Sequence, residues 1–192
     1  MKQDVLYPSL EQMEEEISRI RYRKRFGTAL RGTVYSLSVV AAIAVLVAML
    51  WMPVLRITGT SMEPTLTDGQ FVAAVKTTGL ETGEICAFYF NNKILLKRVI
   101  AASGSWVDVD AAGNVYVDGT LLEEPYLPEK SPGECNIELP YQVPEGKLFV
   151  MGDDRAVSLD SRSTVVGCVS KEQLLGRVVF RLWPLDVLGI IP

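Results

Sequence analysis

Three segments of this 192-residue chain carry side chains that could act in nucleophilic or acid–base chemistry. The first surrounds Ser61, which lies between a Gly-Thr pair and the turn-forming sequence Met-Glu-Pro. A serine at a sharp bend can present its hydroxyl beside free backbone N–H groups, the arrangement of a nucleophile next to an oxyanion site. An ordinary turn explains the same residues, so this segment alone leaves both interpretations open.

The second candidate is Lys97, which lies in the largely apolar run KILLKRVI at residues 93–100. A lysine removed from water has a lowered pKa and can supply a neutral amine as general base. The competing interpretation is a lysine that keeps its charge at an exposed strand edge, where lysines are common. The third segment, residues 152–162, concentrates charged and hydroxyl side chains, and it is either a structured loop or a solvated one.

The amino-acid composition excludes several catalytic mechanisms and kinds of metal site. The chain contains no histidine, which excludes Ser-His-Asp and Cys-His catalysis and imidazole zinc sites. Its three cysteines, at positions 86, 135 and 168, cannot form a four-cysteine metal site, and they allow at most one internal disulfide. An acid–base catalyst in this chain must therefore use Lys, Asp, Glu, Tyr or Cys, and we predict no metal and no cofactor.

The three segments resemble, in this order, the diagnostic motifs of bacterial type I signal peptidases, particularly the short Gram-positive form. The motifs are SMEPTL at residues 61–66, LLKRVI at 95–100 and GDDRAVSLDSR at 152–162. Further similarity lies in VYVDGTLLEEPYL at 115–127 and RLWPLDVLG at 181–189. The resemblance implies a membrane-anchored serine endopeptidase on a β-rich fold that cleaves signal peptides from exported preproteins through a Ser/Lys dyad.

Matched to those motifs, Ser61 is the expected nucleophile and Lys97 the expected general base. Ser158 matches the hydroxyl that orients the lysine amine, and Asp160 and Arg162 match residues that support its loop. The resemblance also implies signal peptides and membrane lipid as partners, with the export machinery as a further candidate. The chain departs from the family pattern at Gly59, where some members carry a hydroxyl, and at Glu84, Ala101 to Ser105 and Asp154.

A membrane anchor is expected before the first motif. Between Arg31 and Arg56 lie 24 residues without a formal charge, long enough as a helix to cross a hydrocarbon core of about 30 Å. Six cations lie between positions 19 and 31 with no acidic residue among them, and only Arg56 follows the stretch before Lys76. The positive-inside rule then predicts a cytoplasmic segment 1–31, a single transmembrane span 32–55 and an extracytoplasmic domain 56–192 in the cell membrane.

The extracytoplasmic part is predicted to be mainly β, with an antiparallel β-rich catalytic domain. Short runs rich in Val, Ile, Phe and Tyr, separated by turn signals, predict strands. These runs occupy residues 71–75, 84–90, 93–100, 106–109, 114–117, 147–151, 164–169 and 177–182. An insertion is expected around residues 110–145, because residues 122–144 are rich in acids and prolines.

Two other classes of function compete with the peptidase. One is a catalytically silent membrane-anchored homologue that binds signal peptides without cutting them, although such a protein has no chemical need for Ser61, Lys97 and Ser158 together. The other is a self-cleaving Ser/Lys regulator, which would need a basic DNA-binding element. Residues 56–192 carry 12 Lys/Arg and 18 Asp/Glu, a formal charge of −6 that disfavours nucleic acid as a partner.

Overall fold

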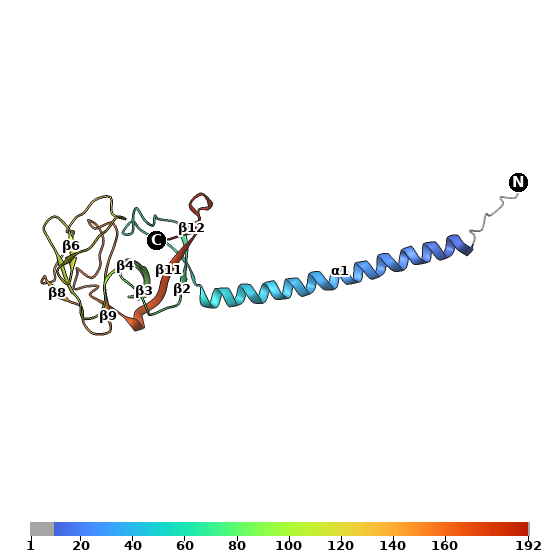
Figure 1. Cartoon of the computed structure of the whole chain (residues 1–192), viewed down its shortest axis with the longest axis horizontal. Coiled ribbons are helices and arrows are strands. Elements are labelled where there is room, and N and C mark those ends of the chain that lie inside the picture. The colour runs from blue at the N-terminus through green and yellow to red at the C-terminus, as the bar shows by residue number, and fades with distance from the viewer. Residues whose placement is uncertain (1–9, 192) are drawn as a thin grey trace. The chain divides into compact units, whose positions relative to one another are not determined.

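The computed structural model describes residues 10–191, and the chain divides into two compact units, Met1–Ala48 and Met49–Pro192. The first unit is formed by helix α1, Leu10–Trp51, which continues into the start of the second unit (Figure 1). Within it, Leu30–Val47 has a mean hydropathy of 1.9, and none of these residues is buried inside the protein. By length and composition this stretch is able to cross a membrane.

The helix differs from the predicted span at both ends. It extends without interruption from Leu10, so residues 10–31 and the apolar stretch form one helix, while residues 1–9 of the predicted cytoplasmic segment lie outside the described residues. It ends at Trp51 rather than at residue 55, because Pro53 lacks an N–H and disfavours helix in the residue before it. The last residues of the predicted span instead form strand β1, Val54–Arg56.

The main sheet of the second unit is antiparallel and has eight strands in the order β1-β2-β11-β3-β4-β9-β10, with β12 also paired to β11. Five of these strands are Phe71–Val75 (β2), Ile85–Phe90 (β3), Lys93–Ala101 (β4), Lys147–Met151 (β9) and Leu174–Trp183 (β11). Two short ones are Val169–Ser170 (β10) and Gly189–Ile190 (β12). Two short 3-10 helices, Lys171–Gln173 and Leu185–Val187, flank β11.

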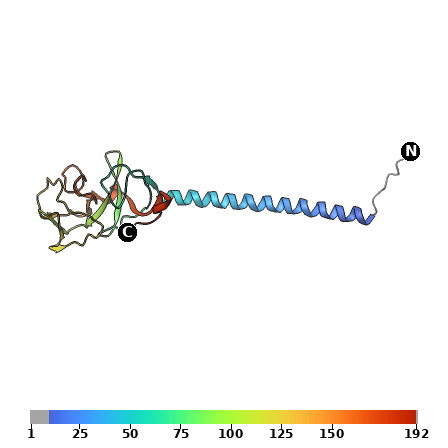
Figure 2. The same ribbon diagram turned by 90° about the horizontal axis from the view of Figure 1, so that it is seen from above.

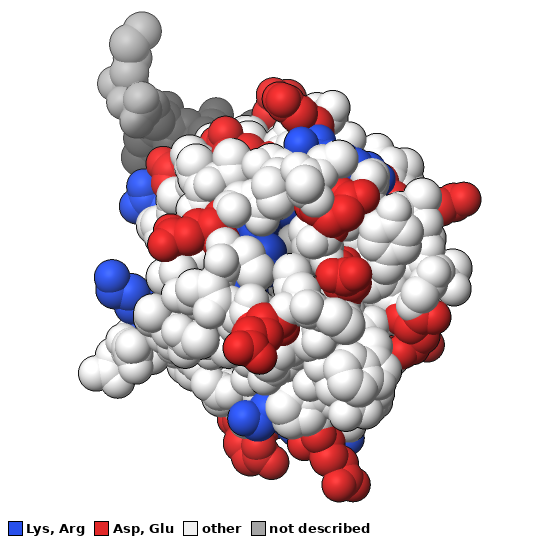
Figure 3. Space-filling view, turned by 90° about the vertical axis from the view of Figure 1, so that its left-hand side faces the viewer, with Lys and Arg blue, Asp and Glu red and all other residues white. Residues whose placement is uncertain are grey.

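A second antiparallel sheet has the strand order β7-β6-β5-β8. Its strands are Trp106–Val109 (β5), Val115–Val117 (β6), Thr120–Leu121 (β7) and Tyr141–Gln142 (β8). In Figures 1 and 2 this sheet lies at the side of the domain away from β12. Figure 3 shows the face on this side, where Asp and Glu are more prominent than Lys and Arg, as the formal charge of the domain predicts.

These two sheets confirm the mainly β, antiparallel fold with one N-terminal apolar helix. Strands β2, β5 and β9 have the predicted bounds, because their alternating or continuous apolar residues are buried. The strand predicted at residues 164–169 is wrong: these residues form turns up to Gly167, and only Val169 is in a strand. Ser163 explains the turn, since its carbonyl accepts hydrogen bonds from the N–H groups of Val166 and Gly167.

Residues 122–140, in the predicted insertion, contain neither helix nor strand. They are nevertheless anchored, because Leu122 and Ile137 pack against a buried cluster that includes Val107, Val115 and Phe149. The cluster draws on both sheets and ties this segment to the domain that carries the motifs. The segment is therefore placed where it can contact the polar loop after β9.

Candidate active site

Ser61 lies on a turn that the hydrophobic core holds in place. Within the turn, the N–H of Glu63 donates to the carbonyl of Thr60 and the N–H of Leu66 donates to the carbonyl of Met62, both at 2.8 Å. The side chains of Met62 and Leu66 are 2% and 0% exposed, and they pack with residues of β2, β3 and β4. Ser61 itself is half-buried, so its hydroxyl sits at the edge of the core.

Lys97 reaches Ser61 from strand β4. It pairs with Cys86 of β3, its side chain is 3% exposed, and its Nζ lies 2.7 Å from Ser61 Oγ as a hydrogen-bond donor. The two residues are 36 positions apart in the sequence. At this distance a proton can pass between the hydroxyl and the amine.

Burial changes the acid–base behaviour of Lys97. The removal of its amine from water lowers the pKa of Lys97 from 10.5 to about 8. The charges of Asp160 and Asp153 raise this pKa by smaller amounts, and the charge of Arg162 lowers it further. No carboxylate lies within 4 Å of its amine among residues 10–191. At pH 7 about one Lys97 side chain in ten is therefore neutral, instead of fewer than about one in a thousand for a free lysine.

The loop that follows β9 carries the other predicted site residues. Arg162 donates from Nε and Nη2 to the two carboxylate oxygens of Asp160, at 2.9 and 2.8 Å, and both side chains are fully buried. Asp160 also accepts a hydrogen bond from the N–H of Gly152. Burial alone would raise the pKa of Asp160, but the hydrogen bonds and charge of Arg162 hold it below its ordinary value. Asp160 and Arg162 thus fix the loop next to the start of the motif.

Ser158 is 5% exposed, and its hydroxyl has no hydrogen-bond partner in the described part of the chain. It lies beside Gly152, where an added methyl group would come within 2.2 Å of Ser158 Oγ and 2.4 Å of the Ser61 carbonyl oxygen. The N–H of Asp154 also donates to that carbonyl, at 3.1 Å. The structure therefore brings Ser158 next to the Ser61 backbone, without a hydrogen bond to Lys97.

Sequence reasoning missed the residues that hold this loop from outside. Glu124, in the segment predicted as an insertion, forms a fully buried ion pair with Arg155. The ring of Tyr126 lies under the guanidinium of Arg98, 3.8 Å from ring centre to Cζ, while Arg98 pairs with Asp153 at 2.7 Å. An acid and an aromatic residue in a proline-rich stretch gave a weak signal, because only the tertiary structure brings them to their arginines.

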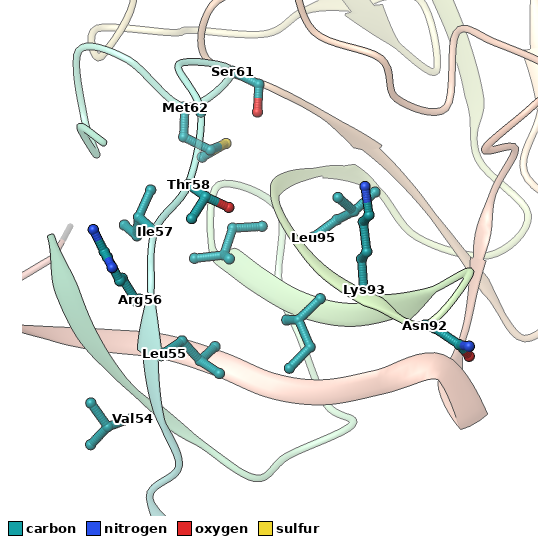
Figure 4. A pocket seen from close by; sticks show the side chains of 13 residues that line it. Val54, Leu55, Arg56, Ile57, Thr58, Ser61, Met62, Asn92, Lys93 and Leu95 are labelled. Carbon is teal, nitrogen blue, oxygen red and sulfur yellow. The ribbon is translucent and has the colours of Figure 1, made fainter. Parts of the chain in front are cut away.

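An open pocket of about 690 Å³ adjoins Ser61 (Figure 4). Its walls are β1 with the residues after it, and the first half of β4. In Figure 4 the Thr58 hydroxyl points into the space between these walls. The pocket is lined by Val54, Leu55, Arg56, Ile57, Thr58, Gly59, Ser61, Met62, Asn92, Lys93, Ile94, Leu95 and Leu96. The pocket thus combines aliphatic side chains and polar groups next to a serine hydroxyl.

The cysteines and carboxylates do not assemble a metal site. Residues 10–191 contain no group of three Cys, Asp or Glu side chains that could hold a metal ion. Cys86, Cys135 and Cys168 are free thiols, and burial raises the pKa of Cys86 to about 12. Cys86 is therefore a neutral neighbour of Lys97 on the adjacent strand.

Comparison with known proteins agrees with this arrangement. The family model "Signal peptidase, peptidase S26" matches residues 30–183. Signal peptidase IB of Staphylococcus aureus (strain Mu50) is 36% identical over 154 residues, covering 67% of this chain and 76% of the relative. Thylakoidal processing peptidase 1 of Arabidopsis thaliana is 34% identical over 145 residues, covering 67% of this chain and 41% of that protein.

Among solved structures, a signal peptidase I from Enterococcus faecalis V583 matches with a TM-score of 0.45 and 27% identity, covering 52% of this chain and 96% of that one. The match of the family model extends over most of the second unit and includes all three motifs. The chain therefore belongs to the signal peptidase family, peptidase S26, and is a peptidase of that family.

Proposed function

We propose that this protein is a membrane-anchored serine endopeptidase that cleaves signal peptides from exported preproteins, with Ser61 as nucleophile and Lys97 as general base. The observation that carries the proposal is the 2.7 Å contact between Lys97 Nζ and Ser61 Oγ at a buried position. Family membership supports the class of reaction, and the S. aureus relative is itself named a signal peptidase. The chain has no histidine that could serve as an alternative base.

The chemistry follows from the neutral amine. Lys97 takes the hydroxyl proton while Ser61 Oγ attacks the scissile carbonyl, and the N–H of Ser61 stabilises the resulting oxyanion. The protonated amine then gives its proton to the leaving nitrogen, so the C–N bond breaks and an acyl-enzyme remains. A water molecule, deprotonated by the same amine, attacks the ester and regenerates Ser61. The N–H of Gly59 is engaged by Asp68 at 2.8 Å, so it is not a second oxyanion donor.

Ser158, Asp160 and Arg162 act as supporting residues in this proposal. The Asp160–Arg162 pair fixes the loop, and the unpartnered Ser158 hydroxyl lies next to the reacting serine. We assign to that hydroxyl the orientation of the lysine amine for proton transfer, as the match to the family motif implies. Ser158 is thus proposed to position Lys97 rather than to contact substrate.

The open pocket beside Ser61 supports a peptide substrate. Over residues 93–97, β4 pairs only with β3 among the described strands, so its other edge is free to pair with an extended peptide. We place the residues one and three positions before the cut in this pocket, where the family resemblance implies shallow apolar subsites for small side chains. Replacing the small residue before the cut by Phe should abolish cleavage of a synthetic signal peptide, and equal cleavage of both peptides would reject this assignment.

Helix α1 supports the membrane anchor in the proposal. Its apolar stretch and the cations before it favour a cytoplasmic N-terminus and an extracytoplasmic peptidase domain. Protease added outside intact spheroplasts should digest the domain and leave the segment before Arg31 protected. The opposite pattern of protection would reverse the topology.

The decisive experiment treats the full-length protein with a serine-acylating inhibitor and locates the adduct by mass spectrometry. We expect a single adduct on Ser61, with none on the Ser61→Ala variant and much slower labelling of Lys97→Met. This result would also exclude the silent-binder alternative, because a binder needs no activated serine. A folded protein whose Ser61 labels no faster than its other serines would contradict the proposal.

A further inference from the structure

Lys93 lies at the far end of the pocket from the proposed dyad. It is the first residue of β4, directly after the tight turn formed by Asn91 and Asn92, whose φ angles of 46° and 62° are left-handed. Such a two-residue hairpin holds the start of the strand in a defined position. In Figure 4 the Lys93 side chain projects from β4 on the same side as Leu95.

The spacing along β4 relates Lys93 to the reacting residues. Lys93, Leu95 and Lys97 alternate along the strand and therefore share one face of the sheet. Four residues of extended chain cover about 13 Å. In a peptide that pairs with the free edge of β4, the side chains one, three and five positions before the cut also share a face and cover the same distance. For a peptide that runs parallel to β4 with the cleaved bond at Ser61, the fifth side chain comes beside Lys93.

The charge at this end of the pocket is unbalanced. No Asp or Glu is among the residues that line the pocket. Lys93 is exposed and takes part in none of the ion pairs recorded between residues 10 and 191. Its ammonium group is therefore available to a side chain of the substrate.

We propose that Lys93 determines specificity at the fifth residue before the cut, favouring Asp or Glu there and disfavouring Lys or Arg. This inference rests on the proposed function, since it takes the pocket to hold the peptide segment before the cleaved bond. It concerns substrate choice alone, and Lys93 has no part in the chemical steps at Ser61.

The test uses full-length protein in detergent micelles and three synthetic signal peptides that differ only in Glu, Gln or Lys at the fifth position before the cut. Within each enzyme we compare kcat/KM between peptides, so differences in folding or active fraction cancel. For the unmodified protein we expect Glu over Lys by about tenfold at low salt, the sum of one exposed attraction and one repulsion. The preference should shrink in 0.5 M salt, because mobile ions screen exposed charges.

The Lys93→Glu variant should reverse the order of the peptides, and Lys93→Gln should make their rates nearly equal. Lys147→Glu is the matched control, since Lys147 is also an exposed lysine at the first position of a strand but does not line the pocket. It should keep the original order. An unchanged order in Lys93→Glu, or an equal loss for all three peptides, would overturn the role of Lys93 while leaving the peptidase proposal intact. No cleavage of even the Gln peptide by the unmodified protein would overturn both.

Discussion

Two neighbouring residues of β4 bury their positive charges in opposite ways. Arg98 is 2% exposed and is held by the carboxylate of Asp153, and the loop after β9 adds two further buried arginine–carboxylate pairs. Lys97, 3% exposed, has the Ser61 hydroxyl as its hydrogen-bond acceptor. Because successive side chains of a strand point to opposite faces, Arg98 binds the loop after β9 while Lys97 contacts Ser61.

This difference separates the structural charges of Arg98, Arg155 and Arg162 from the charge of Lys97, which is proposed to react. A buried ion pair keeps both of its groups charged, because each ion replaces the water that the other has lost. Burial destabilises the charged form of a lysine that has no carboxylate partner. Such a lysine therefore releases its proton at a lower pH. Pairing gives the loop rigidity. Burial without a paired carboxylate lowers the pKa of Lys97 to about 8, which suits its proposed role as base.

The largest expected effect is the loss of activity on changing the reactive cation. Lys97→Arg keeps a positive charge but cannot release it, since guanidinium stays protonated in proteins. We expect kcat/KM for a signal-peptide substrate to fall by at least about a thousandfold, as in Ser61→Ala. Near-normal turnover by folded Lys97→Arg protein would refute the neutral-amine mechanism.

Removing a charge from a structural ion pair should lower the stability of the fold. Asp160→Asn removes the carboxylate from the fully buried Arg162, and we expect the free energy of unfolding to fall by about 3–5 kcal/mol. The matched control is Glu84→Gln, which breaks the more exposed pair with Arg177 and should cost less than about 1 kcal/mol. Urea denaturation of both variants in detergent provides the measurement. Equal losses in the two variants would show that burial does not set the strength of these pairs.

Removing the charge of Lys97 should instead raise the free energy of unfolding. The lowered pKa of Lys97 corresponds to about 3 kcal/mol of lost stability, and the hydrogen bond to Ser61 returns about 1 kcal/mol. Lys97→Met should therefore raise the free energy of unfolding at pH 7 by about 2 kcal/mol while abolishing cleavage.

The pH dependence of that gain follows from proton binding. Between pH 8 and 10.5 the unfolded chain holds a proton on Lys97 that the folded protein has released, so the stability of the parent protein rises with pH across this window. The advantage of Lys97→Met should be full below about pH 8 and disappear by about pH 10.5. Urea titrations at several pH values test this, and a destabilised variant at pH 7 would contradict it.

The smallest expected effect is the pH profile of the parent enzyme. Because kcat/KM reports groups of the free enzyme, it should rise about tenfold per pH unit below pH 8 and level off above it. Steady-state rates between pH 6 and pH 9 measure this limb. A limb centred near 10.5 would mean that Lys97 is as well solvated as a free lysine.

Local sequence patterns were sufficient to predict much of the fold of this protein. The apolar run after Arg31 and the strand-forming segments at β2, β5 and β9 were identifiable from residue types and spacing. The three motifs around Ser61, Lys97 and Ser158 were identifiable from their resemblance to signal peptidases. The absence of histidine left Lys, Asp, Glu, Tyr and Cys as the possible acid–base residues. Residues 164–169 show the limit of such patterns, because side-chain and backbone acceptors at Asn136 and Ser163 hold them in turns.

Long-range contacts and the shortest strands could be found only in the tertiary structure. The contact of Lys97 with Ser61 and the ion pairs of Arg98 with Asp153 and Arg155 with Glu124 join residues that are 31 to 55 positions apart. The short strands β7, β8 and β12 have too few residues for a hydrophobic period, and only pairing with a neighbour defines them. The sequence by itself thus determined which residues could react. The tertiary structure decided which of two equally buried neighbours has a carboxylate partner, because only the fold places Asp153 beside Arg98 and, within residues 10–191, no carboxylate beside Lys97.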